Sequence, residues 1–347
     1  MSPYRGRAIP TDRLTLTEAG LYCPAGGFHI DPVRPVERAL ITHGHADHAR
    51  AGHGAVMASG ETLKIMAARY GEDFAGSSEK ATMGESLRMG DVEVSFHPAG
   101  HVLGSCQIRL DFSGFRIVVS GDYKRQADPT CAAFELLPCD IFITEATFGL
   151  PVFRHPKAED EIAKLLKSLR LFPDKTHLVG AYALGKAQRV IALLRQAGYD
   201  KPIYLHGALE TLCRLYEEEG VELGPLEPVG KRGKELAGEI VIAPPGQLAD
   251  RWARRFGDPA TALASGWMRV RARARQRGAE LPLIISDHAD WDDLCATVLE
   301  TGAEEIWVTH GAEEALVHWC KTAGLKARPL NMIGYEDSGE TAESSGA

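Results

Sequence analysis

Apolar and polar residues are patterned in two different ways along this chain. In the first 150 residues, short apolar segments bounded by turn residues predict β-strands. Strands are expected at residues 28–31, 39–42, 92–97, 107–112, 115–120 and 140–144. Only residues 62–70 of this part have the apolar spacing of a helix. We therefore expect a first part that is rich in strands and poor in helices.

The pattern changes after Gly149, where strand and helix signals alternate. Strands are expected at residues 178–182, 203–205, 240–243, 263–264, 283–286 and 306–309, and helices at 158–171, 186–197, from 206 to 219, 291–301 and 312–323. Such alternation is typical of a parallel α/β unit. The last dozen residues, 336–347, are acidic and rich in Gly and Ser, and we expect them to be disordered.

Composition narrows the class of protein. The chain has 347 residues, of which 44% are hydrophobic and 25% charged, as expected for a soluble globular protein of about two domains. No apolar run approaches the ~20 residues of a membrane helix, and residues 1–13 lack the apolar core of a secretory signal. Seven cysteines without a C-x-x-C pair fit a reducing compartment. We therefore expect a cytoplasmic protein without a membrane partner.

Charge is distributed unevenly. The net charge of −8 argues against wholesale binding of nucleic acid but leaves room for a local basic surface. Eight arginines lie between positions 251 and 277, namely Arg251, Arg254, Arg255, Arg269, Arg271, Arg273, Arg275 and Arg277. A solvated helix face and a phosphate-binding stripe explain this cluster equally well.

The strongest chemical signal is the segment His43-Gly44-His45-Ala46-Asp47-His48, directly after an expected strand. Its imidazole and carboxylate groups are the usual ligands of zinc and similar ions. Alternate residues of an extended segment share a face, so His43 and His45 can bind one ion. A turn at Asp47-His48 would aim these two side chains at a second ion.

Other polar residues follow apolar strands in the same manner. These are His101, Asp122, Glu145, His288 and His310. Because the ends of several strands can meet at one edge of a sheet, we expect a single rim lined with functional groups. His206 lies within the alternating α/β part and is interpreted as structural or peripheral. A structural role is also expected for His29, His53, His97, His155, His177 and His318.

The motif His43-x-His45-x-Asp47-His48, followed by His101 and Asp122, resembles the metallo-β-lactamase superfamily, and Asp31 matches its first, structural aspartate. Glu145, His288 and His310 match the further motifs of its β-CASP nuclease branch. The resemblance implies an α/β fold, an αββα sandwich with an inserted α/β β-CASP domain. The first domain would comprise residues 1–149 and 282–335, with the insertion at 150–281 and the tail at 336–347. The sequence segments 41–50 and 183–188 resemble those of bacterial ligase-associated DNA exonucleases.

The resemblance also implies roles for individual residues. It implies two divalent metal ions, zinc in the first place with manganese as the alternative. The implied ligands are His43, His45 and His101 for one ion, Asp47, His48 and His310 for the other, and Asp122 as the bridge. Asp47, Glu145 and His288 are the implied catalytic residues. Ser265, Gly266 and Lys186 are the implied contacts to the substrate phosphate.

The implied function is hydrolysis of phosphodiester bonds in DNA, by an exonuclease of DNA repair with a DNA ligase and other repair proteins as partners. One residue instead favours RNA as the substrate, because a histidine at the position of His310 is typical of the RNA-cutting members of the branch that the chain resembles. The alternatives are therefore an RNA-processing β-CASP ribonuclease and a hydrolase of small substrates. A non-catalytic scaffold would be expected to have lost some of the ligands, all of which are present here.

Overall fold

The computed structural model describes residues 13–332, which form two compact units. Among the described residues, the first unit contains 13–127, Cys131–Pro151 and 288–332. The second contains Asp128–Thr130 and Val152–Asp287. The expected disordered tail at 336–347 lies outside the described residues. No helix within residues 13–332 is long and apolar enough to cross a membrane.

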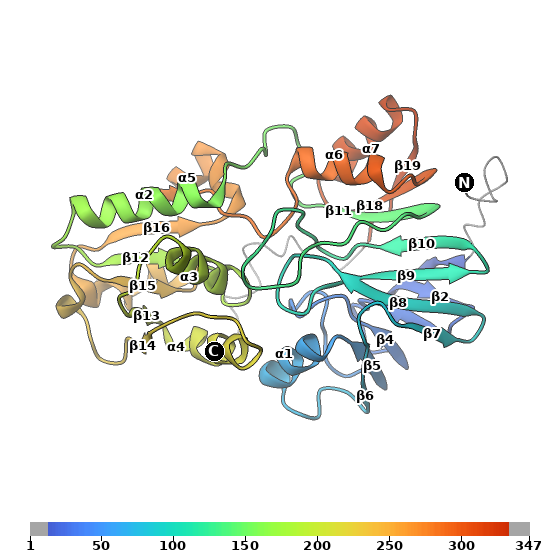
Figure 1. Ribbon diagram of the computed structural model, residues 1–347, viewed down its shortest axis with the longest axis horizontal. Coiled ribbons are helices and arrows are strands. Elements are labelled where there is room, and N and C mark those ends of the chain that lie inside the picture. Colours follow the sequence, from blue (N-terminus) through green and yellow to red (C-terminus); the bar gives the residue numbers. More distant parts are fainter. Residues whose placement is uncertain (1–12, 333–347) are drawn as a thin grey trace. The chain divides into compact units, whose positions relative to one another are not determined.

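Two sheets form the centre of the first unit (Figure 1). The six-stranded sheet has the order β1-β2-β3-β4-β5-β6, with β1 Thr15–Thr17, β2 Gly20–Cys23, β3 Phe28–Ile30, β4 Arg38–Leu40, β5 Ala55–Ala58 and β6 Ser78–Lys80. The seven-stranded sheet has the order β19-β18-β11-β10-β9-β8-β7, with β7 Ser86–Met89, β8 Val92–Pro98, β9 Cys106–Phe112, β10 Phe115–Val119, β11 Ile141–Ala146, β18 Glu305–Gly311 and β19 Lys326–Pro329.

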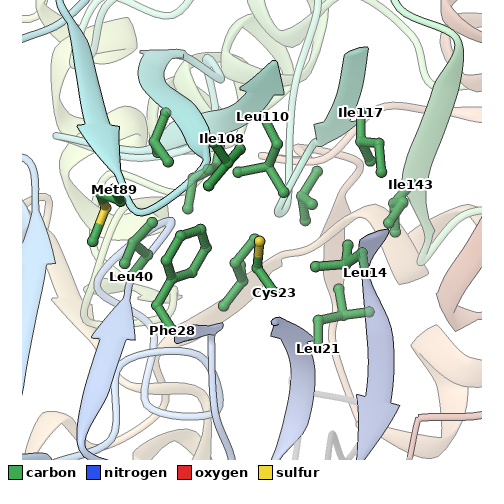
Figure 2. Close-up of a cluster of buried hydrophobic side chains, with 14 of the residues drawn as sticks. Leu14, Leu21, Cys23, Phe28, Leu40, Met89, Ile108, Leu110, Ile117 and Ile143 are labelled. Atoms are coloured by element: carbon green, nitrogen blue, oxygen red, sulfur yellow. The ribbon is translucent and has the colours of Figure 1, made fainter. Parts of the chain in front are cut away.

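The main hydrophobic core lies between these sheets, because each sheet buries alternate residues of its strands there. Figure 2 shows Phe28 and Leu40 of the first sheet facing Ile108, Leu110 and other residues of the second. Each fully buried aliphatic side chain of this kind contributes roughly 1.5–3 kcal/mol through removal of its surface from water.

The outer faces of both sheets are covered by helices. On the six-stranded sheet, Ile41 and Val56 pack with Met66 of α1 (Gly60–Tyr70). On the seven-stranded sheet, Phe142 packs with Leu294 of α6 (Trp291–Glu300) and with residues of α7 (Glu313–Thr322). The order of layers is helix, sheet, sheet, helix, which confirms the predicted αββα sandwich.

The second unit is built on one parallel sheet, with the order β14-β13-β15-β12-β16-β17. Its strands are β12 His177–Gly180, β13 Ile203–Leu205, β14 Leu226–Pro228, β15 Ile240–Ala243, β16 Ala260–Ala264 and β17 Leu281–Leu283. Its helices are α2 Ala158–Leu171, α3 Lys186–Gln196, α4 Gly207–Glu218 and α5 Arg271–Gln276, with short 3₁₀ turns at Lys234–Leu236, Pro245–Leu248, Ala253–Phe256 and Gly266–Arg269. This is the α/β arrangement that the alternating pattern predicts.

Two expectations about this region need correction. The strand expected at residues 283–286 is shorter and earlier, and as β17 it pairs with β16 inside the second unit. The chain therefore rejoins the first unit at His288 rather than at residue 282. Seven further short strands were not predicted from the sequence, namely β1, β2, β5, β6, β7, β14 and β19.

Candidate metal centre

The segment from His43 to His48 lies in the loop after β4. His45 O accepts hydrogen bonds from His48 N at 3.1 Å and from Ala49 N at 2.8 Å, so the chain turns here as expected. Gly44 lies against α1, where an added Cβ would come within 2.7 Å of a side-chain atom of Ile65. The loop is thus held against a helix, with its polar side chains turned towards the ends of the strands.

Buried hydrogen bonds fix the orientation of two of these histidines. Asp31 Oδ2 accepts a hydrogen bond from Thr42 Oγ1 at 2.6 Å and lies 2.8 Å from His48 Nδ1. Because the hydroxyl hydrogen of Thr42 is donated to Asp31, Thr42 Oγ1 can only accept from His43 Nδ1, 3.0 Å away. This network assigns the proton of His43 to Nδ1 and leaves the lone pair of Nε2 facing the site.

The remaining candidates come from neighbouring strand ends. Strands β10, β11 and β18 are parallel neighbours, so Asp122, Glu145 and His310 lie at the same edge of the seven-stranded sheet. His101 follows β8, which has the same direction as β10 because each pairs antiparallel with β9. The single rim expected from the sequence is therefore present.

Four side chains converge at this rim, since each of His43, His45, His101 and Asp122 offers one ligand atom and these atoms lie within 4.8 Å of one another. His45 Nδ1 lies 3.1 Å from His43 Nε2 and 3.0 Å from His101 Nε2. Asp122 Oδ2 lies 3.5 Å from His43 Nε2 and 3.8 Å from His101 Nε2. Ligands about 2.1 Å from a tetrahedral zinc ion would be about 3.4 Å apart, so the donor set fits such an ion.

The second expected set is more loosely arranged. His48 Nε2 lies 3.5 Å from both Asp47 Oδ2 and Asp122 Oδ2, so Asp122 contacts both sets. The rings of His48 and His310 stack with their centroids 5.0 Å apart. Asp47 Oδ2 is buried and accepts no hydrogen bond within residues 13–332. These donors could hold an ion, although the structure does not gather Asp47, His48 and His310 as closely as the first four.

Burial and neighbouring charges act on these groups in opposite directions. Burial, reinforced by the other histidines, holds the pKa of His43 well below its usual value, so its imidazole stays neutral and able to bind metal. Burial also opposes protonation of His48, but the carboxylates of Asp122, Asp47 and Asp31 outweigh it and raise its pKa to about 10. Burial raises the pKa of Asp122 to about 7 against the opposing effect of His48.

A β-bulge positions His310. Glu145 pairs with Thr309 and Ala146 with Gly311, so His310 is the extra residue of β18. Its φ of 59° is in the left-handed region, which few residues other than glycine adopt. Burial lowers its pKa to about 3, so the ring is neutral.

His288 and Glu145 form a pair beside the candidate ligands. His288 Nδ1 lies 3.0 Å from Glu145 Oε2, and Glu145 is fully buried. Burial opposes ionisation of Glu145, but the nearby His288 outweighs it and lowers the pKa of this carboxyl group. Asp122, Glu145 and His288 also have ligand-capable atoms within 4.8 Å of one another. His288 therefore lies closer to the candidate metal ligands than its sequence position suggested.

The three residues expected to contact phosphate lie in the second unit. Ser265 and Gly266 follow β16, and Ser265 Oγ accepts a hydrogen bond from Trp267 N at 3.3 Å. Lys186 is only 3% exposed, and its ammonium group forms an ion pair with Asp287. Asp287 thus already partners the charge of Lys186, and the expected contact of Lys186 with phosphate stays a prediction. The roles of Ser265 and Gly266 stay predictions.

Sequence reasoning missed the threonines that support the site. Thr309 Oγ1 lies 3.1 Å from His310 Nδ1, as Thr42 Oγ1 does at 3.0 Å from His43 Nδ1. The repeated Thr-His dipeptide at two strand ends was the signal that could have revealed them. Ser105 was missed as well, and its Oγ accepts a hydrogen bond from His101 N at 3.1 Å.

Comparison with known proteins finds relatives that are nucleic-acid enzymes by name. No family model matches the chain. A probable DNA ligase of Opitutus terrae is 29% identical over 323 residues, covering 89% of this chain and 30% of the relative. The endoribonuclease YSH1 of Gibberella zeae is 32% identical over 135 residues, covering 36% of this chain and 16% of the relative. The cleavage and polyadenylation specificity factor 73 of Drosophila melanogaster is 30% identical over 125 residues, covering 33% of this chain and 18% of the relative.

The chain spans less than a third of the length of these curated relatives. A solved structure, a protein of unknown function from Enterococcus faecalis V583, aligns with a TM-score of 0.53 at 12% identity, covering 78% of this chain and 74% of that one. This likeness concerns the fold alone.

The fold, the motif order and these relatives together support placing the chain in the β-CASP branch of the metallo-β-lactamase superfamily. This family implies divalent metal ions, and the four converging side chains of the rim are groups that can hold one.

Proposed function

We propose that this protein is a metal-dependent nuclease that hydrolyses phosphodiester bonds of DNA, acting as an exonuclease in DNA repair. The observation that carries the proposal is the convergence of His43, His45, His101 and Asp122 within 4.8 Å, in a chain of the β-CASP branch. Such a donor set suits zinc, and manganese is the alternative.

In this proposal His43, His45 and His101 would hold one ion and Asp47, His48 and His310 a second, with Asp122 near both ligand sets. Bound divalent ions would lower the pKa of a water molecule and stabilise negative charge on the phosphate. Asp31 and Thr42 keep His48 and His43 turned with Nε2 towards the site, through the contacts of 2.8 Å and 3.0 Å described above.

His288 would act as the general acid of the reaction. Glu145 accepts from His288 Nδ1, which leaves His288 Nε2 to face the substrate. A carboxylate partner favours the protonated imidazole, so Nε2–H can donate its proton to the leaving oxygen. Glu145 in this reading is a positioning residue that orients His288.

DNA is favoured over RNA because the relative with a DNA-related name matches the larger share of this chain. The relative that matches 89% of this chain carries a DNA ligase name, whereas the two RNA-related relatives above match 36% and 33% of it. We also propose a DNA ligase and other repair proteins as partners, because this relative carries a DNA ligase name, and a cytoplasmic location on the composition of the chain. RNA processing is the second candidate, favoured by His310 and by the endoribonuclease relatives. A small-substrate hydrolase is the third, and the second unit, which supplies a surface for a polymer, argues against it.

Digestion of matched, end-labelled DNA and RNA strands by the purified full chain, with zinc or manganese, tests the proposal. We expect the DNA strand to be shortened progressively from one end, and Asp122→Asn protein to leave it intact. Preferred cleavage of RNA would replace the first candidate by the second. Failure to cleave either strand with either metal would overturn the proposed activity.

A further inference from the structure

Helix α5 and the turn before it carry an unusual concentration of positive charge. Residues 269–277 contain five arginines and no acidic residue, in a chain whose net charge is −8. Arg269, Arg271 and Arg275 are exposed, and the helix is anchored through the buried Ala274. The local charge is thus opposite in sign to that of the whole chain.

Several exposed arginines elsewhere have a carboxylate partner. Arg34 lies 2.7 Å from Glu18, and Arg232 lies 2.6 Å from Glu227. Within the part of the chain that the structure describes, Arg269, Arg271 and Arg275 form no ion pair with a carboxylate. Their charge is therefore available to an external anion.

The position of Arg271 does not favour the helix. Arg271 and Arg275 are four residues apart on α5, so their like charges repel on one face. Arg271 also lies at the positive end of the helix dipole, where an acidic residue would be stabilising and none occurs in the first turn. Arg273 and Arg275 lie in the last turn, where positive charge suits the helix dipole, so helix stability accounts for these two but not for Arg271.

Arg273 is held in place by an aromatic ring. Its guanidinium carbon lies 3.9 Å from the centroid of the Trp267 ring, a cation–π contact. Stacking uses the face of the guanidinium group and leaves N–H donors of its edge for an acceptor. A guanidinium fixed in this way loses less freedom when it binds phosphate.

We propose that Arg269, Arg271, Arg273 and Arg275, here called the arginine face, bind the sugar-phosphate backbone of a nucleic acid strand. The inference rests on the proposed function only in that such a strand is the substrate. Guanidinium groups bind phosphate oxygens through paired, charge-assisted hydrogen bonds and read no base sequence. The arginine face would therefore add sequence-independent, salt-sensitive affinity.

The test compares the salt dependence of binding between the wild-type full chain, loaded with metal, and the double variant Arg271→Gln/Arg275→Gln. The probe is a labelled DNA strand with a phosphorothioate backbone, which keeps the charge but resists hydrolysis. Each phosphate contact on a single strand contributes about 0.7 to the slope of log K against log salt, so the double variant should lower the slope by about 1.4. The matched control Arg34→Gln/Arg232→Gln removes the same charge from ion-paired positions and should leave the slope unchanged.

An unchanged slope in the double variant, or an equal decrease in the control, would overturn the proposal. So would binding to anionic phospholipid vesicles that depends on Arg271 and Arg275 while nucleic acid binding does not. Cleavage of an ordinary DNA strand by the same wild-type protein is measured in parallel. If the double variant has the smaller salt slope but the wild type cleaves no DNA, the proposed nuclease activity is rejected and the arginine face is supported. The failure of one proposal can therefore be told from the failure of the other.

Discussion

His48 Nδ1 lies 2.8 Å from Asp31 Oδ2, and both side chains are buried. This contact joins the end of β3 to the metal-motif loop after β4. Because one ring nitrogen of His48 is committed to Asp31, the other must face Asp47 and Asp122. Asp31 therefore acts on the site through His48.

The first prediction concerns Asp31→Asn. Asp31 has a φ of 43°, a conformation that asparagine also tolerates, so the backbone should be retained. Removal of a supporting carboxylate of this kind typically lowers metal affinity by about 10–100-fold, and we expect that range here. Competition with a chelator of known affinity measures it. Unchanged affinity in a folded variant would show that Asp31 only closes the loop.

The second prediction concerns the bulge that places His310. In Gly311→Ala, a new Cβ would come within 2.2 Å of Ala146 O, at a φ of 73°. Gly302→Ala is the matched control, because its φ of 68° is similar but its surroundings are open. The left-handed conformation should destabilise both variants by about 1–2 kcal/mol.

Gly311→Ala should be destabilised further and should also lose bound metal, because the clash displaces His310. Denaturant unfolding and metal analysis of both variants check this. Equal losses of stability with full metal content in both would contradict a role for the bulge.

The third prediction separates proton transfer from metal binding. His288→Ala should lower the rate of single-turnover cleavage by about 10²–10⁴-fold, the usual contribution of general acid catalysis, while bound metal is retained. His318→Ala, on the exposed side of α7, is the control and should be fully active. The short distances among Asp122, Glu145 and His288 make the metal analysis decisive. If metal is lost in proportion to activity, His288 is a ligand rather than the acid.

Part of the fold and of the candidate site could be predicted from the sequence, for reasons that differ between residues. The rim was predictable because each of His43, His101 and Asp122 directly follows an apolar strand, and strand ends meet at a sheet edge. The layers were predictable only through the family resemblance, because this strand is apolar on both faces and the sequence does not show that Phe142 and Ile143 pack into different cores.

Other features depend on contacts between distant residues. The ion pair of Lys186 with Asp287 joins positions about a hundred residues apart, so no local pattern predicts it. The bulge at His310 arises from the register between β11 and β18, which no local pattern encodes. The support from Thr42 likewise depends on Asp31 of another strand.

The central claim is a metal centre in which Asp122 contacts both ligand sets. The most direct measurement is the number of divalent ions bound per chain, together with cleavage, in wild type and Asp122→Asn. The account predicts two ions and cleavage for the wild type. It predicts less metal and no cleavage for the variant, with its unfolding transition preserved. Full metal content and full activity in Asp122→Asn would contradict the account.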